Sequence, residues 1–341
     1  MSVLLKRPAV DHRAYWLILA IPLAAMALCA PLLLGYGVPP LRPIALIYNG
    51  LLYLLSAVML LCGELLWRLA KDKPDSPFRY VRDSAWPRQR IDALRRSWPI
   101  IAALIVFMPF FSTMKAAIPL FTDYTWDETW IALDRTIHGD DPWRLLMPVL
   151  GFPLATAFIA LLYHLWILLI YMGSMGLCLY LDDARLKARY FMAFFLCWIV
   201  LGVGAATAFA SVGPCFLGPM LGIDTFADQM AWLRQADARI PIMVLHVQDT
   251  LIEWQRSGAQ GLGRGISAMP SMHVSVALLF ALVCRQISRP LFIAASVFAL
   301  LILIGSVHLA YHYAVDGYFA IAGTLAIWWL CGWVEKASSR T

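Results

Sequence analysis

The chain has 341 residues, of which 61% are apolar and only 14% are charged. Because soluble domains carry roughly a quarter of charged residues, this composition excludes a water-soluble enzyme, and its apolar content excludes a disordered chain. The net charge of +6 is not gathered on a soluble basic segment, so we expect no nucleic-acid partner. The seven cysteines show no CxxC spacing, and we therefore expect neither a disulfide framework nor a zinc site.

Apolar segments long enough to cross a bilayer follow one another along the whole chain. They cover residues 14–34, 44–67, 98–119, 152–180, 190–212, 269–286, 290–309 and 312–334. The sequence therefore predicts an all-α integral membrane protein with about eight transmembrane helices.

The charges between these segments predict an orientation. Residues 68–96 contain nine basic and four acidic residues, which places them in the cytoplasm by the positive-inside rule. The linkers 181–189 and 287–289 and the C-terminal tail then fall on the same side, and all carry basic residues. The acidic segment 120–151 and the long segment 213–268 fall on the opposite side. We therefore expect both termini to be cytoplasmic.

Two segments on the outer side combine apolar and polar residues. Residues 124–147 mix tryptophans and leucines with acids, which predicts a pair of amphipathic helices in the membrane interface with the aromatic side toward lipid. Residues 226–257 have a similar pattern and predict short helices that cover the outer mouth of the bundle.

The first candidate for chemistry is the pair His312 and Asp316, at the outer junction of the last two apolar segments. Their spacing of four places both side chains on one face of a helix, within contact distance. A carboxylate on one ring nitrogen fixes the tautomer and leaves the other nitrogen free with a lone pair. The pair is thus suited to act as an oriented nucleophile.

The second candidate is the turn Pro270-Ser271-Met272-His273, at the outer start of the sixth apolar segment. Ser271 can cap the helix that follows, and the free backbone N–H groups there attract anions. His273 adds a proton donor. Together the two segments predict phosphoryl transfer through a phosphohistidine.

The same residues are compatible with different roles. A His–Asp pair with this spacing is commonly an ion pair on a helix surface. His308, His312 and Asp316 share a face and are possible metal ligands. A proton relay in a transporter is a further alternative, although the chain has no internal repeat and both motifs lie at the ends of segments.

Pro270-Ser271-x-His273 followed by His312-x-x-x-Asp316 resembles the type 2 phosphatidic acid phosphatase superfamily, and within it the branch of inositol phosphorylceramide synthases. Further matching features are Lys115 to Pro119, Asp134 to Trp143 and Gly213 to Phe216. The resemblance covers residues 98–334. It implies a six-helix phosphatase-like core at 98–341, preceded at 1–97 by a two-helix extension with a basic cytoplasmic linker.

The resemblance also implies a role for each matching residue. His312 attacks phosphorus, Asp316 holds His312, and His273 protonates the leaving oxygen. Ser271 and the backbone near Gly265 bind phosphate oxygens. The family needs no metal or other cofactor.

The chain departs from the superfamily pattern in its cations. The lysine motif that usually comes first is absent, and serine at position 306 stands where the third motif has arginine. Our candidates for the missing phosphate-binding cations are Lys115, near the outer end of the third segment, and Arg264, shortly before the Pro-Ser turn. Alternatively, Lys115 extends its amine to the interface, and Arg264 is a solvated loop cation.

The remaining candidates are placed in the substrate pocket. They are His308, Tyr311, Asp134 and Arg135. For Asp134 and Arg135, a plain helix cap and a salt bridge are equally compatible with the sequence.

We expect a lipid phosphotransferase or phosphatase whose active site faces the extracytoplasmic side. The donor is a phospholipid or polyprenyl phosphate, and the acceptor is a lipid alcohol such as ceramide, or water. A proton-coupled transporter and an inactive lipid-binding scaffold are the alternatives of another class.

Overall fold

The computed structural model describes residues 12–257 and 265–338, and within them all regular secondary structure is helical. Segments at Ile18–Gly35, Pro43–Asp72, Trp86–Phe121, Pro153–Tyr180, Ala184–Ala208, Arg289–His308 and Ala314–Val334 are long and apolar enough to cross a membrane. A shorter apolar helix, Met272–Ile287, completes the set. These eight match the eight predicted segments in order and position, so the chain is an all-α integral membrane protein.

The helices that build these spans are α1 (His12–Gly35), α2 (Pro43–Asp72), α4 (Trp86–Phe121), α7 (Pro153–Leu165) with η1 (Leu169–Gly173) and α8 (Ser174–Tyr180), α9 (Ala184–Leu196) with η2 (Cys197–Ala205) and α10 (Ala206–Ala208), α14 (Met272–Ile287), α15 (Arg289–His308) and α16 (Ala314–Ser338). The segments η1 and η2 are π-helical, a form that is frequent near functional sites. The helices between the spans are α3 (Pro77–Asp83), α5 (Asp127–His138), α6 (Pro142–Leu150), α11 (Pro214–Leu221), α12 (Ala227–Asp237) and α13 (Met243–Ser257).

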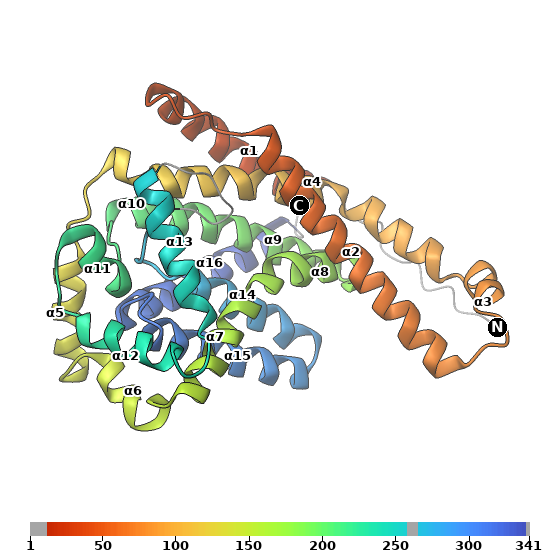
Figure 1. Ribbon diagram of the computed structural model, residues 1–341. Coiled ribbons are helices and arrows are strands. Elements are labelled where there is room, and N and C mark those ends of the chain that lie inside the picture. The colour runs from red at the N-terminus through yellow and green to blue at the C-terminus, as the bar shows by residue number, and fades with distance from the viewer. Residues whose placement is uncertain (1–11, 258–264, 339–341) are drawn as a thin grey trace.

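The two ends of the bundle differ in structure (Figure 1). Helices α2 and α4 extend away from the rest of the molecule and carry α3 at their far end, while α5, α6, α11 and α12 gather at the opposite end. The basic linker and the acidic outer segments therefore lie at opposite ends, as the charge pattern predicts. Which end faces the cytoplasm stays a prediction.

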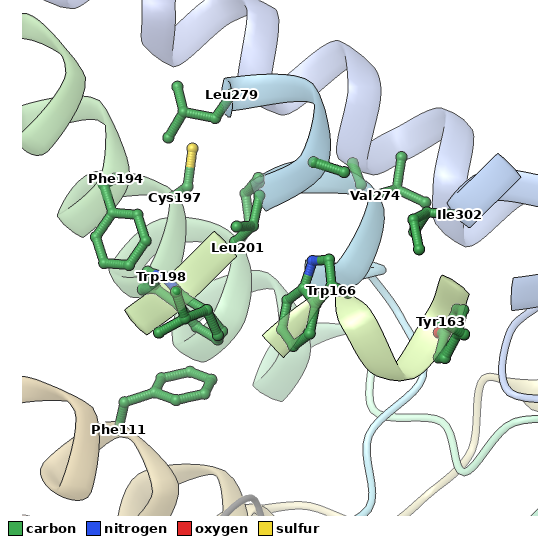
Figure 2. Close-up of a cluster of buried hydrophobic side chains, with 14 of the residues drawn as sticks. Phe111, Tyr163, Trp166, Phe194, Cys197, Trp198, Leu201, Val274, Leu279 and Ile302 are labelled. Carbon is green, nitrogen blue, oxygen red and sulfur yellow. The ribbon is translucent and has the colours of Figure 1, made fainter. Parts of the chain in front are cut away.

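The short helix α14 occupies the centre of the bundle. It packs against α15, α16, α9, η1 and η2. Large buried side chains fill the space between these elements (Figure 2), among them Trp198 of η2, whose ring lies 4.4 Å from that of Phe111 on α4. The first turn of α14, which carries the Pro-Ser-x-His turn, is thus enclosed by helices from distant parts of the sequence.

The N-terminal helices pack on the outside of this core. Helix α1 contacts α4 and α9, and α2 contacts α4, η1 and α8. Helix α4 runs without a break from Trp86 to Phe121, so the division that we expected at residue 97 falls inside one helix. That division stays a prediction.

A buried polar contact joins α2 to α4 at a proline. Pro109 lacks an N–H, so the carbonyl of Ile105, four residues earlier, loses its helical partner. The Asn49 amide donates to this carbonyl at 2.8 Å and to that of Leu104 at 3.2 Å, and its own oxygen accepts from the Tyr171 hydroxyl. In an apolar environment this pairing replaces the hydrogen bond that the proline removed.

The helix pair α5 and α6 forms where residues 124–147 predicted it, but our expectation for its aromatic side was wrong. Trp130 and Trp143 are only 8% and 6% exposed, because they pack into the protein. Trp130 lies 5.9 Å from the ring of Phe209. Aliphatic side chains occupy the exposed faces instead, among them Ile137 and Val149.

Candidate active site

The loop that carries His312 begins where α15 ends. The N–H of Ala310 bonds to the carbonyl of Val307, and the N–H of Tyr311 bonds to that of Ser306, both at 3.0 Å. This is the Schellman arrangement, whose turn residue adopts the left-handed conformation. Here that residue is Ala310, with φ of 61°, rather than the usual glycine. The Ser306 carbonyl also accepts the N–H of His312, so position 306 shapes the loop through its backbone.

Groups of the outer helices bind the carbonyls of this turn. Gln229 of α12 donates to the carbonyls of Val307 and His308, and Gln248 of α13 donates to that of Leu309. The N–H of Cys215 on α11 bonds to the Ala310 carbonyl at 2.8 Å. Because the last carbonyls of a helix have no partner within the helix, α11, α12 and α13 together hold the loop in place.

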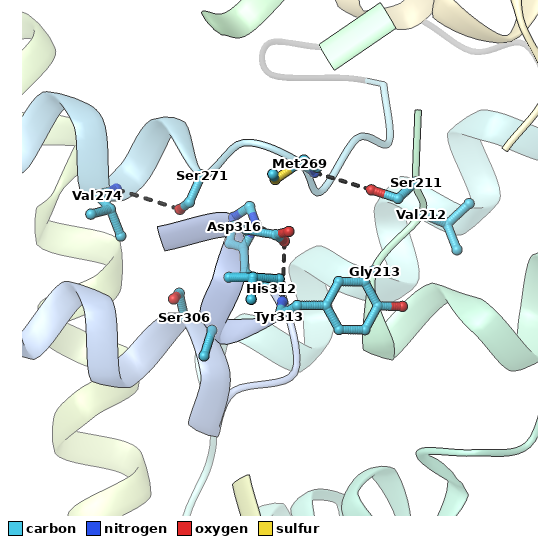
Figure 3. A network of polar contacts seen from close by, with 12 residues as sticks. Ser211, Val212, Gly213, Met269, Ser271, Val274, Ser306, His312, Tyr313 and Asp316 are labelled. Atoms are coloured by element: carbon cyan, nitrogen blue, oxygen red, sulfur yellow. Dashed lines mark hydrogen bonds and ion pairs between the residues drawn. The ribbon is translucent and has the colours of Figure 1, made fainter. Parts of the chain in front are cut away.

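The contact between His312 and Asp316 is confirmed (Figure 3). The Nδ1 of His312 lies 3.2 Å from Oδ2 of Asp316, which also accepts the N–H of Tyr313 at 3.1 Å. Asp316 is fully buried and His312 is 6% exposed. None of the residues that the structure describes hydrogen-bonds Nε2 of His312.

The start of α14 lies directly beside this pair. The Ser271 hydroxyl accepts the N–H of Val274 at 3.4 Å, which confirms it as the N-cap. The ring centroids of His273 and His312 are 5.9 Å apart. The two motifs, some forty residues apart in sequence, thus lie side by side in the structure.

Asp127, a buried carboxylate that the sequence analysis missed, binds the loop that carries His312 through Tyr313. Asp127 of α5 accepts the N–H groups of Val212 and Gly213 at 3.0–3.1 Å and the Tyr313 hydroxyl at 2.8 Å. Burial, together with the charge of Asp127, raises the pKa of Tyr313 and keeps its hydroxyl protonated as a donor. The spacing of seven between Asp127 and Asp134 was the available signal, because it places both on one face of a helix.

Asp134 caps the helix that carries Asp316. Its two oxygens accept the N–H groups of Ala314 and Val315, at 2.8 and 2.9 Å, in the first turn of α16. Burial raises the pKa of Asp134, and these two N–H groups oppose that rise. Both carboxylate oxygens are therefore engaged with backbone.

Arg135 turns away from this cap. It forms a two-pronged ion pair with Asp141, at 2.7 and 3.1 Å, and is about half exposed. A helix cap at Asp134 and a salt bridge at Arg135 agree with these contacts, and their place in a substrate pocket stays a prediction.

Lys115 and Gly265 meet at the edge of the site. Gly265 has φ of +95°, and a Cβ there would come within 2.7–2.9 Å of the backbone of Lys115 and Ala116. Only glycine fits this close approach. Lys115 is partly buried, and its role as a phosphate-binding cation stays a prediction. Arg264, the other candidate cation, lies outside the described residues.

His308 and Tyr311 have separate surroundings. His308 is buried, with Nε2 2.9 Å from the Thr156 hydroxyl, and does not join the His312–Asp316 pair. Tyr311 stacks at 5.2 Å on Tyr163 of α7 and donates its hydroxyl to a carbonyl of α13. Among the described side chains, no three of the types that ligate metals lie close enough together to hold an ion.

A cavity of about 360 Å³ lies on the far side of the loop. Its lining includes Cys215 and Gln248, which hold the loop backbone, together with Phe226 and Arg234. Neither His273 nor His312 lines it. The cavity therefore lies beside the residues that hold the His312 loop and not beside His273 and His312 themselves.

The comparison with protein families gives the class of this arrangement. The profile of the PAP2 superfamily matches residues 128–331, more than half of the chain. The chain therefore belongs to the PAP2 superfamily. The matched range contains Ser271, His273, His312 and Asp316 and omits α1 to α4, so it is narrower than the resemblance over 98–334.

Members of this superfamily are phosphoesterases, which supports an enzymatic function for this membrane protein. No curated protein and no solved structure matches the chain. The branch within the superfamily is therefore a matter for proposal.

Proposed function

We propose that this protein transfers a phosphoryl-containing group between lipids through a phosphohistidine at His312. One observation carries the proposal: the buried Asp316 binds Nδ1 of His312, while the ring of His273 lies 5.9 Å from the His312 ring. A nucleophile with its orienting carboxylate thus faces a second imidazole across the space that a phosphoryl group needs.

The reaction has two half-steps. In the first, Nε2 of His312 forms a bond to phosphorus, the bond from phosphorus to the leaving alkoxide breaks, and His273 gives that oxygen a proton. In the second, His273 takes the proton of an acceptor hydroxyl, whose oxygen attacks phosphorus and releases His312. Asp316 stabilises the positive charge that His312 carries in between.

The negative charge on the phosphoryl oxygens must be stabilised by hydrogen-bond donors or cations beside His273 and His312. A helix N-terminus favours anions, and α14 begins beside the His312–Asp316 pair, where the Ser271 N–H bonds to the Asp316 carbonyl. Ser271, Lys115 and the backbone at Gly265 border it, and Arg264 is proposed as a second cation. No metal or other cofactor is needed for these steps.

We propose a phospholipid or polyprenyl phosphate as donor, and a lipid alcohol such as ceramide as acceptor, as in inositol phosphorylceramide synthases. The site lies at the ends of α14 and α16, where a headgroup at the bilayer surface can reach it. Water as acceptor would make the protein a lipid phosphatase by the same first half-step. The positive-inside pattern supports an extracytoplasmic site and cytoplasmic termini.

The test is a substrate screen of the purified protein. Labelled phosphatidylinositol, phosphatidic acid and polyprenyl diphosphate are supplied, each with and without ceramide. We expect turnover of at least one of them, lost in His312→Ala and kept in His246→Ala, a control on the exposed side of α13. No turnover of any phosphorus-containing lipid, or full activity of His312→Ala, would contradict the proposal.

A further inference from the structure

His273 is surrounded by aromatic rings rather than by hydrogen-bonding groups. Its ring centroid lies 4.0 Å from that of Trp166 and 4.3 Å from that of Tyr163, with the Tyr163 ring tilted by only 22°. Tyr311 follows at 6.3 Å. None of the described residues hydrogen-bonds the imidazole of His273, whereas His312 has the carboxylate of Asp316. The two histidines of the site are thus held by different means.

The local fold explains why both rings reach His273. Tyr163 and Trp166 are three residues apart at the end of α7, so they project from the same face of the helix. Figure 2 shows them beside the start of α14, near Val274. Tyr163 also packs against Tyr311, at 5.2 Å and nearly parallel.

Gly305 lies beside the Tyr163 ring. A Cβ at Gly305 would meet Cδ2 of Tyr163 at an ordinary contact distance of 3.5 Å and would clash with Cγ2 of Ile159 at 2.8 Å. Position 305 precedes Ser306, which stands where the superfamily pattern has arginine. The aromatic cluster therefore reaches the part of the site where that arginine is absent.

We propose that Tyr163 and Trp166 are positioning residues, which hold the His273 ring toward His312 and stabilise its protonated form through their π faces. The inference rests on the proposed function, because it assigns His273 the role of proton donor. A cation over an aromatic face is attracted by the ring quadrupole, most strongly where water is excluded. Such a contact takes the place that a carboxylate has at His312.

The ionisable groups around His273 do not supply this support. They are Lys115 of α4, His312 of the α15–α16 loop and His164 of α7. All three are neutral or positive, so none of them favours a proton on His273. The π faces of Tyr163 and Trp166, which contact the His273 ring directly, do favour a proton on His273.

The experiment is a pH–rate profile of kcat/KM in the wild type and in matched variants. Tyr163→Met and Trp166→Met keep most of the volume and remove the π face, whereas Tyr163→Phe keeps the face. Trp98→Leu removes a ring from the exposed aromatic pair with Trp16, far from the site, and serves as control. We expect each methionine variant to move the alkaline limb to lower pH by about one unit and to lower kcat at least tenfold with little change in KM.

Tyr163→Phe should behave as the wild type. The Tyr163 hydroxyl is buried without a hydrogen-bond partner among the described residues, so its removal breaks no contact. A Tyr163→Phe variant as impaired as Tyr163→Met would assign the effect to the hydroxyl and overturn the inference.

The remaining outcomes separate this inference from the proposed function. A wild type that turns over lipid, with an alkaline limb that stays in place or moves to higher pH in a folded methionine variant, overturns the inference alone. A wild type without turnover overturns the proposed function and the inference with it. If one methionine variant fails to fold, the other tests the same claim, because the two rings touch His273 independently.

Discussion

The main-chain N–H of Ser271 donates a hydrogen bond of 3.2 Å to the main-chain carbonyl of Asp316. This contact joins the first turn of α14, which carries His273, to the first turn of α16, which carries the partner of His312. Because the bond is between backbones, it fixes the spacing of the two helix starts. The rings themselves are held by side chains, His312 by Asp316 and His273 by its aromatic neighbours.

Asp127→Asn should loosen the support of this site. The variant loses the charge and one of two acceptor oxygens, while the Val212 and Gly213 N–H groups and the Tyr313 hydroxyl still need partners. An unpaired buried donor costs about 1–3 kcal/mol, so we expect a lower Tm in detergent and a lower kcat. Glu128→Gln, at the exposed neighbouring position, is the matched control and should change neither. An unchanged Tm in Asp127→Asn would show that this carboxylate is dispensable.

Ala310→Gly should stabilise the protein. Ala310 adopts φ of 61°, which is strained for a residue with a Cβ. Glycine removes this strain but adds freedom to the unfolded chain, so we expect a net gain of up to about 1 kcal/mol, measured as a rise in Tm. Activity should be kept, because the Schellman hydrogen bonds do not involve the methyl group. A fall in Tm would mean that the packing of this methyl group outweighs the strain.

Asn49→Leu tests the polar contact between α2 and α4. It leaves the Ile105 carbonyl and the Tyr171 hydroxyl without their partner, at a cost of about 0.6–1.7 kcal/mol in a membrane interior. Pro109→Ala gives residue 109 an N–H, which can donate to the Ile105 carbonyl in place of the Asn49 amide. We therefore expect Asn49→Leu to cost less in the Pro109→Ala background, which a double-mutant cycle measures. Strict additivity would refute the link between Asn49 and the proline.

The sequence predicted the spans well because a helix buried in lipid needs a long run of consecutive apolar residues, which the sequence shows directly. It also predicted the contact of His312 with Asp316, since a spacing of four residues is a local property of helices. Asp127, Gln229 and Gln248 escaped prediction because their partners lie 61 to 186 residues away. Such contacts depend on how α5, α12 and α13 pack against the loop. The spacing of Asp127 and Asp134 shows that they share a helix face, but it does not show what that face contacts.

The aromatic residues were misjudged for a related reason. An amphipathic pattern around Trp130 and Trp143 shows that one face is apolar, but it does not show whether lipid or protein covers that face. In the structure the protein covers it. Likewise, nothing local marked Tyr163 and Trp166 as neighbours of His273, because they lie on a different helix.

The most direct test of the central claim is to look for the covalent intermediate. His273→Ala protein is mixed with a lipid labelled at phosphorus, quenched at alkaline pH, which preserves phosphohistidine, and mapped by mass spectrometry. The account predicts a phosphoryl-containing group on His312 and none in the His312→Ala variant. A label on another residue, or no label in wild type and His273→Ala while the wild type turns over the same lipid, would contradict it.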